Sequence, residues 1–230
     1  MKKKCLWFSL AFRIILFVVC LLGVINTLQV RLPALGGDGK PLFLHFTTWT
    51  AWLCCLSVLV GLVFNIIALA GKKNLLDSSV YRVVKLCADS MAIVTFIIAA
   101  FVLPEKIWTA EYWTYGWIIK HFLIPVLTVL ETVFFFKSTI KWWEPLLASL
   151  PMLLYGSYMI PHVLICRAQH GGHIPEELWG NFYPYGFTNI DKNGGSPILF
   201  FALILGLAAL MIGVAYIYYA IYKKKNKKNK

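Results

Sequence analysis

Three side chains suited to acyl chemistry lie near the ends of apolar segments. Thr47 lies near the start of segment 44–70, His121 near the start of segment 117–136, and His162 near the end of segment 142–166. A histidine beside a hydroxyl is typical of an activated nucleophile, because the imidazole accepts the proton and the alkoxide attacks an acyl carbon. This pattern predicts lipid ester chemistry near one membrane surface. A threonine in a membrane helix also often bonds only to its own backbone, so a structural role stays open.

The composition requires most of the chain to lie in a membrane. Of its 230 residues, 60% are hydrophobic and 14% are charged, and the mean hydropathy is +0.72. An average soluble domain is about 45–50% apolar and about 25% charged. This excess excludes a soluble globular domain, a secreted disulfide-stapled protein and a disordered chain.

Six apolar segments are long enough to span a bilayer, which takes about 20 residues as a helix. The sequence therefore predicts an all-α integral membrane protein with a six-helix domain over 1–222 and a basic cytoplasmic tail at 223–230. The predicted spans are 6–29, 44–70, 80–103, 117–136, 142–166 and 197–222.

The distribution of basic residues predicts the orientation. With both termini on one side, that side carries fifteen of the 22 Lys and Arg residues, including Arg82 and Lys85 as loop residues, against five on the other. Lysine and arginine accumulate on the cytoplasmic side of membrane proteins. Both termini are therefore expected to be cytoplasmic.

No residue pattern indicates nucleic acid, a metal or a cofactor. Nine of the basic residues lie in the two terminal runs, where they orient the chain and contact anionic headgroups. The six cysteines form no CxxC motif and are interpreted as buried thiols. His170 and His173 flank two glycines in a polar loop, and two ligands alone do not define a metal site.

Charged residues inside predicted spans form a second layer nearer the cytoplasmic side. Arg13 and Asp89 lie about 10–14 Å deep at 1.5 Å per residue, so we expect an ion pair that Glu131 can join. Both a structural clamp and a proton or ion pathway remain open for this layer. Lys120 is expected to extend its ammonium toward the outer interface.

Three short elements, taken in order, resemble the androgen-induced protein family, which includes the androgen-dependent regulator of tissue factor pathway inhibitor and many bacterial membrane proteins. The segment 45–50 (HFTTWT) is similar to the family's Phe-Thr element. The segment 121–125 (HFLIP), followed by Glu131, resembles its histidine helix, and the segment 181–187 (NFYPYGF) its Tyr-Pro-aromatic element. The ordered set extends from the second predicted span to the sixth.

The resemblance implies a membrane threonine hydrolase of fatty acid esters of hydroxy fatty acids. The nucleophile would be Thr47 and the base His121, although the adjacent Thr48 leaves the register of the nucleophile open, since successive helical residues point about 100° apart. The oxyanion donors are not identified, and His45, Thr50 and Asn181 are the candidates within reach. Further substrate-contacting or supporting candidates are His45, Thr48, Thr50, Glu131, His162, Tyr183 and Tyr185.

The sequence therefore predicts an intramembrane lipid ester hydrolase with no cofactor, working on lipid ester substrates among membrane lipids. Two alternatives stay open: a lipid acyltransferase, and a non-catalytic lipid-binding or transport protein. The tyrosines of the 181–187 element form either a lid over the outer opening or part of an interfacial aromatic belt. The lysine- and asparagine-rich tail indicates a multi-pass protein of a bacterial plasma membrane, whose oligomeric state the sequence does not reveal.

Overall fold

The computed structural model describes residues 3–72, 75–102, 114–136, 138–185, 188–192 and 196–228. It is an all-helical structure, with 81% of residues in helices and no strand among those described. Six of its helices are long and apolar enough to cross a membrane. The predicted class, a multi-pass helical membrane protein, is confirmed at that level.

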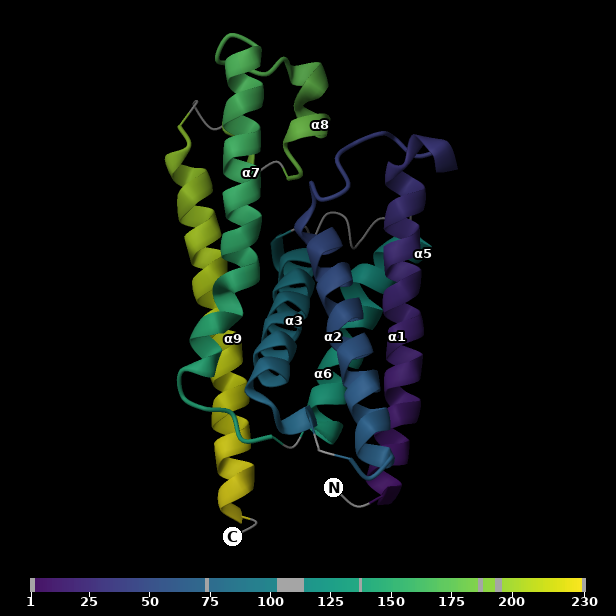
Figure 1. Cartoon of the computed structure of the whole chain (residues 1–230). Helices are drawn as coiled ribbons and strands as arrows, with labels where there is room; N and C mark the ends of the chain where they lie inside the picture. Colours follow the sequence, from purple (N-terminus) through teal and green to yellow (C-terminus); the bar gives the residue numbers. More distant parts are fainter. Residues whose placement is uncertain are drawn as a thin grey trace.

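The first half of the chain supplies three spanning helices. They are α1 (Lys3–Arg31), α2 (Phe46–Leu69) and α3 (Ser79–Ile97), and α3 continues as the π-helical turn η3 (Ile98–Val102). Short 3₁₀ turns, η1 (Pro33–Leu35) and η2 (Leu75–Asp77), lie in the connections. Both termini lie at the same end of the bundle (Figure 1).

The second half is less regular. The fourth span joins α5 (Tyr115–Ile118), the π-helical turn η5 (Ile119–Leu123) and α6 (Ile124–Phe135). The fifth joins the 3₁₀ turn η6 (Glu144–Ser149) to α7 (Leu150–Gln169). The short elements η7 (Glu176–Leu178) and α8 (Trp179–Phe182) follow, and the last helix, α9 (Ile198–Lys228), continues through most of the predicted tail.

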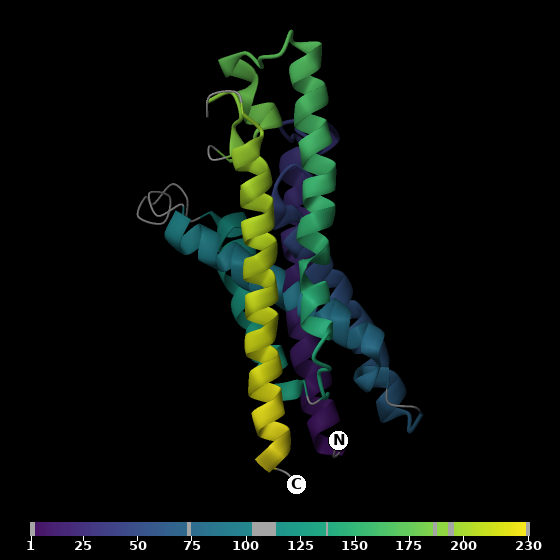
Figure 2. The ribbon, with the colours of Figure 1, turned by 90° about the vertical axis from the view of Figure 1, so that its left-hand side faces the viewer.

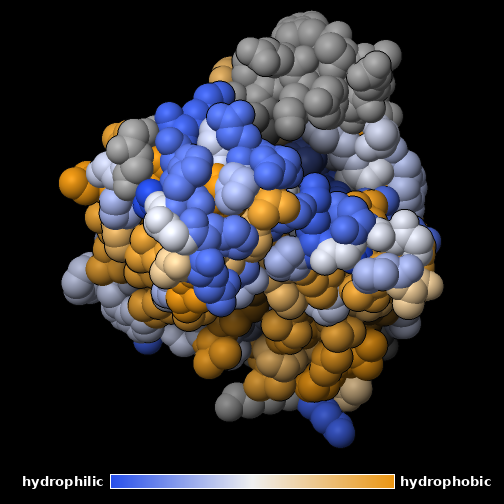
Figure 3. All heavy atoms as spheres, turned by 90° about the horizontal axis from the view of Figure 1, so that it is seen from above, coloured by the Kyte–Doolittle hydropathy of each residue, from blue (hydrophilic) through white to orange (hydrophobic). Residues whose placement is uncertain are grey.

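Helix α3 is the most enclosed of the six spans, and it packs against α2, α6 and α9. Figure 2 shows it crossing the bundle obliquely while α7 and α9 run along it. Its side chains are correspondingly mixed in polarity, since a helix that meets neighbours on most sides needs little lipid-facing surface. Viewed from the end opposite the termini, hydrophilic residues gather on that end, and hydrophobic ones form much of the surrounding surface (Figure 3).

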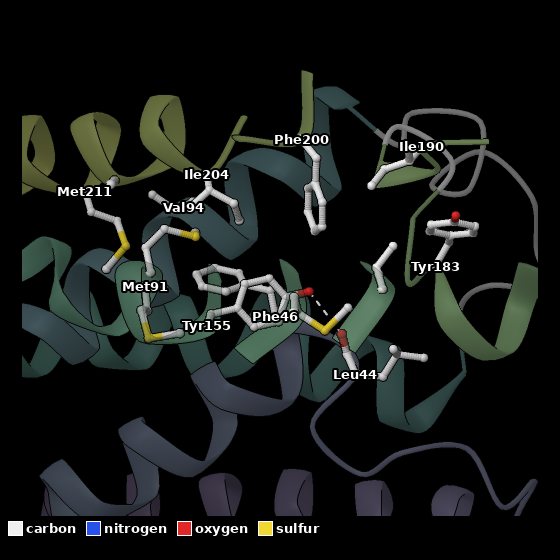
Figure 4. Close-up of a cluster of buried hydrophobic side chains, with 14 of the residues drawn as sticks. Leu44, Phe46, Met91, Val94, Tyr155, Tyr183, Ile190, Phe200, Ile204 and Met211 are labelled. Atoms are coloured by element: carbon white, nitrogen blue, oxygen red, sulfur yellow. Dashed lines mark hydrogen bonds between the residues drawn. The ribbon is translucent and has the colours of Figure 1, made fainter. Parts of the chain in front are cut away.

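One buried cluster fixes the start of α2. Tyr155 of α7 donates a hydrogen bond to the carbonyl of Leu44 at 3.0 Å, and its ring meets Phe46 edge-on at 5.5 Å (Figure 4). Met91 and Val94 of α3 belong to the same cluster, with side chains from α9. The first turn of α2 is therefore held by three other helices.

A fully buried network of four charges joins α1, α3 and α6. Arg13 contacts Glu131 at 2.8 Å, and Lys85 contacts the other Glu131 oxygen at 2.6 Å and also pairs with Asp89. None of the four residues is more than 2% exposed. Arg13 also donates to Asn65 of α2 at 2.9 Å, so the network reaches a fourth helix.

This network corrects two expectations. The predicted Arg13–Asp89 pair is wrong, because Arg13 binds Glu131 and Asp89 pairs with Lys85. Lys85 and Arg82, counted among the cytoplasmic loop charges although they fall within the predicted span 80–103, are both buried, and Arg82 pairs with Glu144 at 2.7 Å. They lie in the first turns of α3, whose N-terminal end packs against the η6 segment. The expectations for Lys73 and Lys137 fall outside the described residues.

We predict that Arg13→Met lowers the melting temperature of the purified protein, because it leaves two buried carboxylates with one cation. Removing one partner of a buried pair typically destabilises by about 3–5 kcal/mol. The double variant Arg13→Met/Glu131→Gln restores neutrality and should recover much of the loss. Thermal unfolding in one detergent compares the three proteins, and an unchanged Arg13→Met variant would contradict the clamp.

Candidate functional site

The nucleophile candidates lie in the first turn of α2. His45 is the N-cap residue in extended conformation, and Thr47 and Thr48 follow it directly. The first backbone N–H groups of a helix have no partner within that helix, so they face outward from its N-terminus. The first turn of α2 therefore presents both hydroxyls and hydrogen-bond donors at one place.

His121 lies in the π-helical turn η5, and the sequence explains this turn. Pro125 follows His121 by four residues and has no N–H to donate to the His121 carbonyl, so a regular α-helical bond there is impossible. The helix widens locally instead, as π-turns do at many functional sites. This turn presents successive residues, Lys120 and His121, to one cavity.

The His121 ring is oriented by Trp117. Its Nδ1 lies 3.1 Å from the Trp117 carbonyl, and the indole stacks on the imidazole with centroids 5.1 Å apart. A carbonyl only accepts, so Nδ1 carries the proton and Nε2 is the basic nitrogen. This carbonyl has the role of the orienting group that the sequence does not reveal.

Thr47 and His121 line the same cavity, which has a volume of about 220 Å³. Helix α1 forms one wall, and Pro184 of the loop between α8 and α9 also lines the cavity. A smaller cavity of about 10 Å³ is bordered again by Thr47, His121 and Tyr185, together with residues of α3 and η3. The polar residues lining the larger cavity are Thr27, Arg31, His45, Thr47, Thr48, Lys120, His121 and Tyr185.

Tyr185 reaches the start of α2 from the loop that precedes α9. Its hydroxyl interacts with the Thr47 hydroxyl and with the backbone N–H groups of Phe46 and Thr47. Burial raises the pKa of this phenol to about 12, an effect that these donors partly oppose. Tyr185 therefore stays a neutral O–H group at ordinary pH, next to the candidate nucleophile.

The loop holds Tyr185 through a turn and a buried carboxylate. Thr188 accepts from the Tyr185 N–H at 3.3 Å and donates to its carbonyl at 2.6 Å. Asp191, whose side chain has no exposed surface, accepts from the Tyr183 hydroxyl at 2.6 Å and from the Ile174 N–H at 3.0 Å. Arg167 lies 3.0 Å from the same carboxylate.

The remaining candidates separate into two groups. His45 and Thr48 line the larger cavity with Thr47, whereas Thr50 bonds to Thr95 of α3 at 2.8 Å and faces the helix interface. Glu131 belongs to the buried ionic network. Tyr183 is buried at Asp191, so only Tyr185 of the two tyrosines reaches the cavity.

His162, a candidate supporting residue at a similar depth, does not line the cavity. Its ring stacks on Tyr158 at 5.8 Å and approaches Phe182 at 6.0 Å, away from the lining residues. Asn181 likewise lies in α8 and does not line the cavity. Gly186 and Phe187 of the same sequence element fall outside the described residues.

The described part of the chain contains no group of three or more metal-binding side chains. His170 bonds to the Cys166 carbonyl at 2.8 Å, and His173 lies 3.2 Å from Asp191. A further cavity of about 220 Å³ between α3 and α6 is lined by apolar residues such as Phe96 and Pro125, and therefore offers no reactive group.

Sequence reasoning missed three contributors to the site. Arg31 was counted as an outer-side charge, and only its position at the very end of α1 hints that it can turn toward the start of α2. The Trp117 carbonyl has a simple signal, because a residue four positions before a histidine in a helix is within reach of its ring. Asp191 carries no signal in its local sequence.

No family model matches this chain, and no curated protein or solved structure matches it. The resemblance to the androgen-induced protein family therefore depends on the residue elements quoted above.

We predict that Asp191→Asn loosens the loop that carries Tyr185. Hydrogen bonds from Tyr183 and Ile174 together with the nearby Arg167 keep the pKa of Asp191 below its ordinary value of 3.8, even though burial alone would raise it. A carboxyl whose pKa is lower in the folded state stabilises the protein at any pH above its unfolded-state pKa. This stability is lost as the pH falls through its folded-state pKa. Limited proteolysis of the loop should be faster in Asp191→Asn at pH 6, and the difference from wild type should shrink below pH 4. Equal cleavage at pH 6 would contradict this role.

Proposed function

We propose that the protein is an intramembrane lipid ester hydrolase with Thr47 as nucleophile and His121 as base, cleaving fatty acyl esters such as fatty acid esters of hydroxy fatty acids. The observation that carries this proposal is the shared cavity of Thr47, His121 and Tyr185, with the His121 ring oriented by the Trp117 carbonyl. No cofactor is required for this chemistry.

The acylation step follows from the roles of these groups. Nε2 of His121 accepts the Thr47 proton while Oγ1 attacks the acyl carbon, and the resulting imidazolium donates that proton to the leaving alcohol. Nδ1–H stays bonded to the Trp117 carbonyl throughout, which keeps the ring in position. Water then attacks the acyl-threonine with His121 again as base, and the fatty acid leaves as Thr47 regains its proton.

The tetrahedral intermediate needs donors aimed at its oxyanion. The backbone N–H groups of Phe46 and Thr47 and the Tyr185 hydroxyl meet at the α2 N-terminus, where the helix dipole also favours negative charge. In the resting protein these N–H groups interact with the Tyr185 oxygen. A substrate carbonyl that enters this place would take over the two N–H groups and gain the phenol O–H as a third donor.

The two rival functions predict different products. An acyltransferase shares the acyl-threonine and passes the acyl group to a second lipid, so added lysolipid would shift the products from free acid to diacyl lipid. A non-catalytic lipid-binding or transport protein forms no acyl-enzyme. The ionic network gives the transport alternative little support, because its two cations and two carboxylates pair with one another.

The same proposal includes an orientation. Placing the termini in the cytoplasm of a bacterial plasma membrane follows from the basic residues at that end, and it puts the start of α2 at the outer leaflet. The cavity would then open at the depth of lipid ester bonds. Protease protection of a C-terminal tag in sealed spheroplasts tests this arrangement.

We predict that Thr47→Ala and His121→Asn each reduce kcat for a fatty acyl ester by at least about 10³-fold, because each removes a participant in bond formation. Tyr185→Phe should cost about 10–100-fold in kcat and change KM little, since its O–H acts mainly on the oxyanion. Turnover of purified protein in detergent gives all three values.

His162→Asn is the matched control for the histidine variant, because His162 lies outside the cavity. It should retain near-wild-type turnover. If Thr48→Val abolishes turnover while Thr47→Ala retains it, the register of the nucleophile is wrong. If Thr47→Ala, Thr48→Val and His121→Asn all turn over as the wild type does, the hydrolase mechanism itself is wrong.

A further inference from the structure

Two basic side chains line the same cavity as the candidate nucleophile. Arg31 comes from the last residue of α1, and Lys120 comes from the π-helical turn beside His121. Among the described residues that line the cavity, none is acidic. A partly enclosed polar cavity with two cations and no carboxylate is suited to a negatively charged group.

The charge of Lys120 is not neutralised by any described residue. No hydrogen bond or ion pair joins its ammonium to a described side chain, and Arg31 is a like-charged neighbour. Arg31 itself pairs with Asp38, a partly exposed carboxylate that also lies 3.8 Å from Lys40. Arg31 thus shares one carboxylate with Lys40, and Lys120 is the cavity's basic residue without a described acidic partner.

His45 adds a neutral donor rather than a third charge. Arg31 donates to its Nδ1 at 2.9 Å, and an arginine never accepts, so the His45 proton lies on Nε2. Burial and the neighbouring positive charges lower the pKa of His45 to about 3. The ring is therefore uncharged near neutral pH, and its Nε2–H is a hydrogen-bond donor.

Both basic residues lie beside elements that carry the candidate catalytic residues. Lys120 and His121 are consecutive in one turn, and Arg31 bonds to His45, two residues before Thr47. An anion held between Arg31 and Lys120 would therefore lie in the same cavity as an acyl carbon at Thr47. A single amphiphile that carries both groups close together satisfies this arrangement.

We propose that Arg31 and Lys120 form an anion subsite, and that the ester lipid taken by this cavity carries a carboxylate or phosphate oxyanion close to its scissile ester. The assignment of the ester rests on the proposed function. Binding of the anion does not, and it is measurable without turnover. The arginine provides planar paired donors, and the lysine provides a point charge, so both oxyanions suit the pair.

The first experiment measures binding alone, in the Thr47→Ala protein in phosphatidylcholine nanodiscs. Palmitate and hexadecyl phosphate are compared with uncharged palmitamide by tryptophan quenching. Both anions, or one of them, should bind at least about 10-fold tighter than palmitamide, and the tighter of the two identifies the oxyanion. Lys120→Gln should remove that preference, and Lys120→Arg should restore part of it.

Lys40→Gln is the matched control, because Lys40 carries the same charge at the same end of the molecule but does not line the cavity. Its anion preference should equal that of the parent protein. Equal affinity for palmitate, hexadecyl phosphate and palmitamide would overturn the subsite, and so would an anion preference that survives in Lys120→Gln. Arg31→Gln supplies a second variant if Lys120→Gln does not fold.

The second experiment separates this inference from the proposed function. With Thr47 intact, kcat/KM for an ester that bears a free carboxylate is compared with that for its methyl ester. In Lys120→Gln, kcat/KM for the anionic ester should fall at least about 10-fold, mainly because KM rises. The kcat/KM for the neutral ester should change little. Turnover without any charge preference overturns the anion subsite alone. An anion preference in binding, without turnover of any ester, overturns the hydrolase proposal alone.

Discussion

The buried network of Arg13, Lys85, Asp89 and Glu131 is the constraint on which the helical arrangement depends. Two cations and two carboxylates have almost no solvent contact here. They are tolerated only because they pair, since an unpaired buried charge loses its hydration without gaining a partner. Pairing requires α1, α3 and α6 to meet at one depth and in one rotation. Asn65 of α2 accepts a hydrogen bond from Arg13, so α2 is joined to the same network.

That constraint determines where the site forms. The ionic network holds α1, α2 and α6 together, and the ends of these helices farther from the network lie near the cavity. There α1 carries Arg31, α2 carries Thr47, and the turn leading into α6 carries His121. The reactive groups lie at irregular points: a helix N-terminus, a π-turn caused by Pro125 and a loop held by Asp191. Such points expose N–H groups and side chains that a regular helix interior would cover.

Sequence reasoning recovered the features that depend on local composition. Six apolar runs predicted six helices, and Thr47 and His121 were selected because a hydroxyl and an imidazole share one depth in two predicted spans. The choice of ion-pair partner was not recoverable, since Arg13 had two carboxylates, Asp89 and Glu131, at similar depth and Lys85 was counted with the loop charges. His162 was misplaced in the site because depth along a helix says nothing about which side of the helix faces the cavity. Tyr185 and Arg31 depend on how loops fold back, which apolar periodicity does not encode.

The central claim is that Thr47 is a nucleophile activated by His121, and covalent labelling tests it most directly. The purified, folded protein is treated with a fluorophosphonate carrying a long alkyl chain, and the adduct is located by mass spectrometry of its peptides. The account predicts an adduct on Thr47 that is absent from the His121→Asn protein. A folded wild-type protein that gives no adduct in the first turn of α2, or one that labels equally without His121, would contradict it.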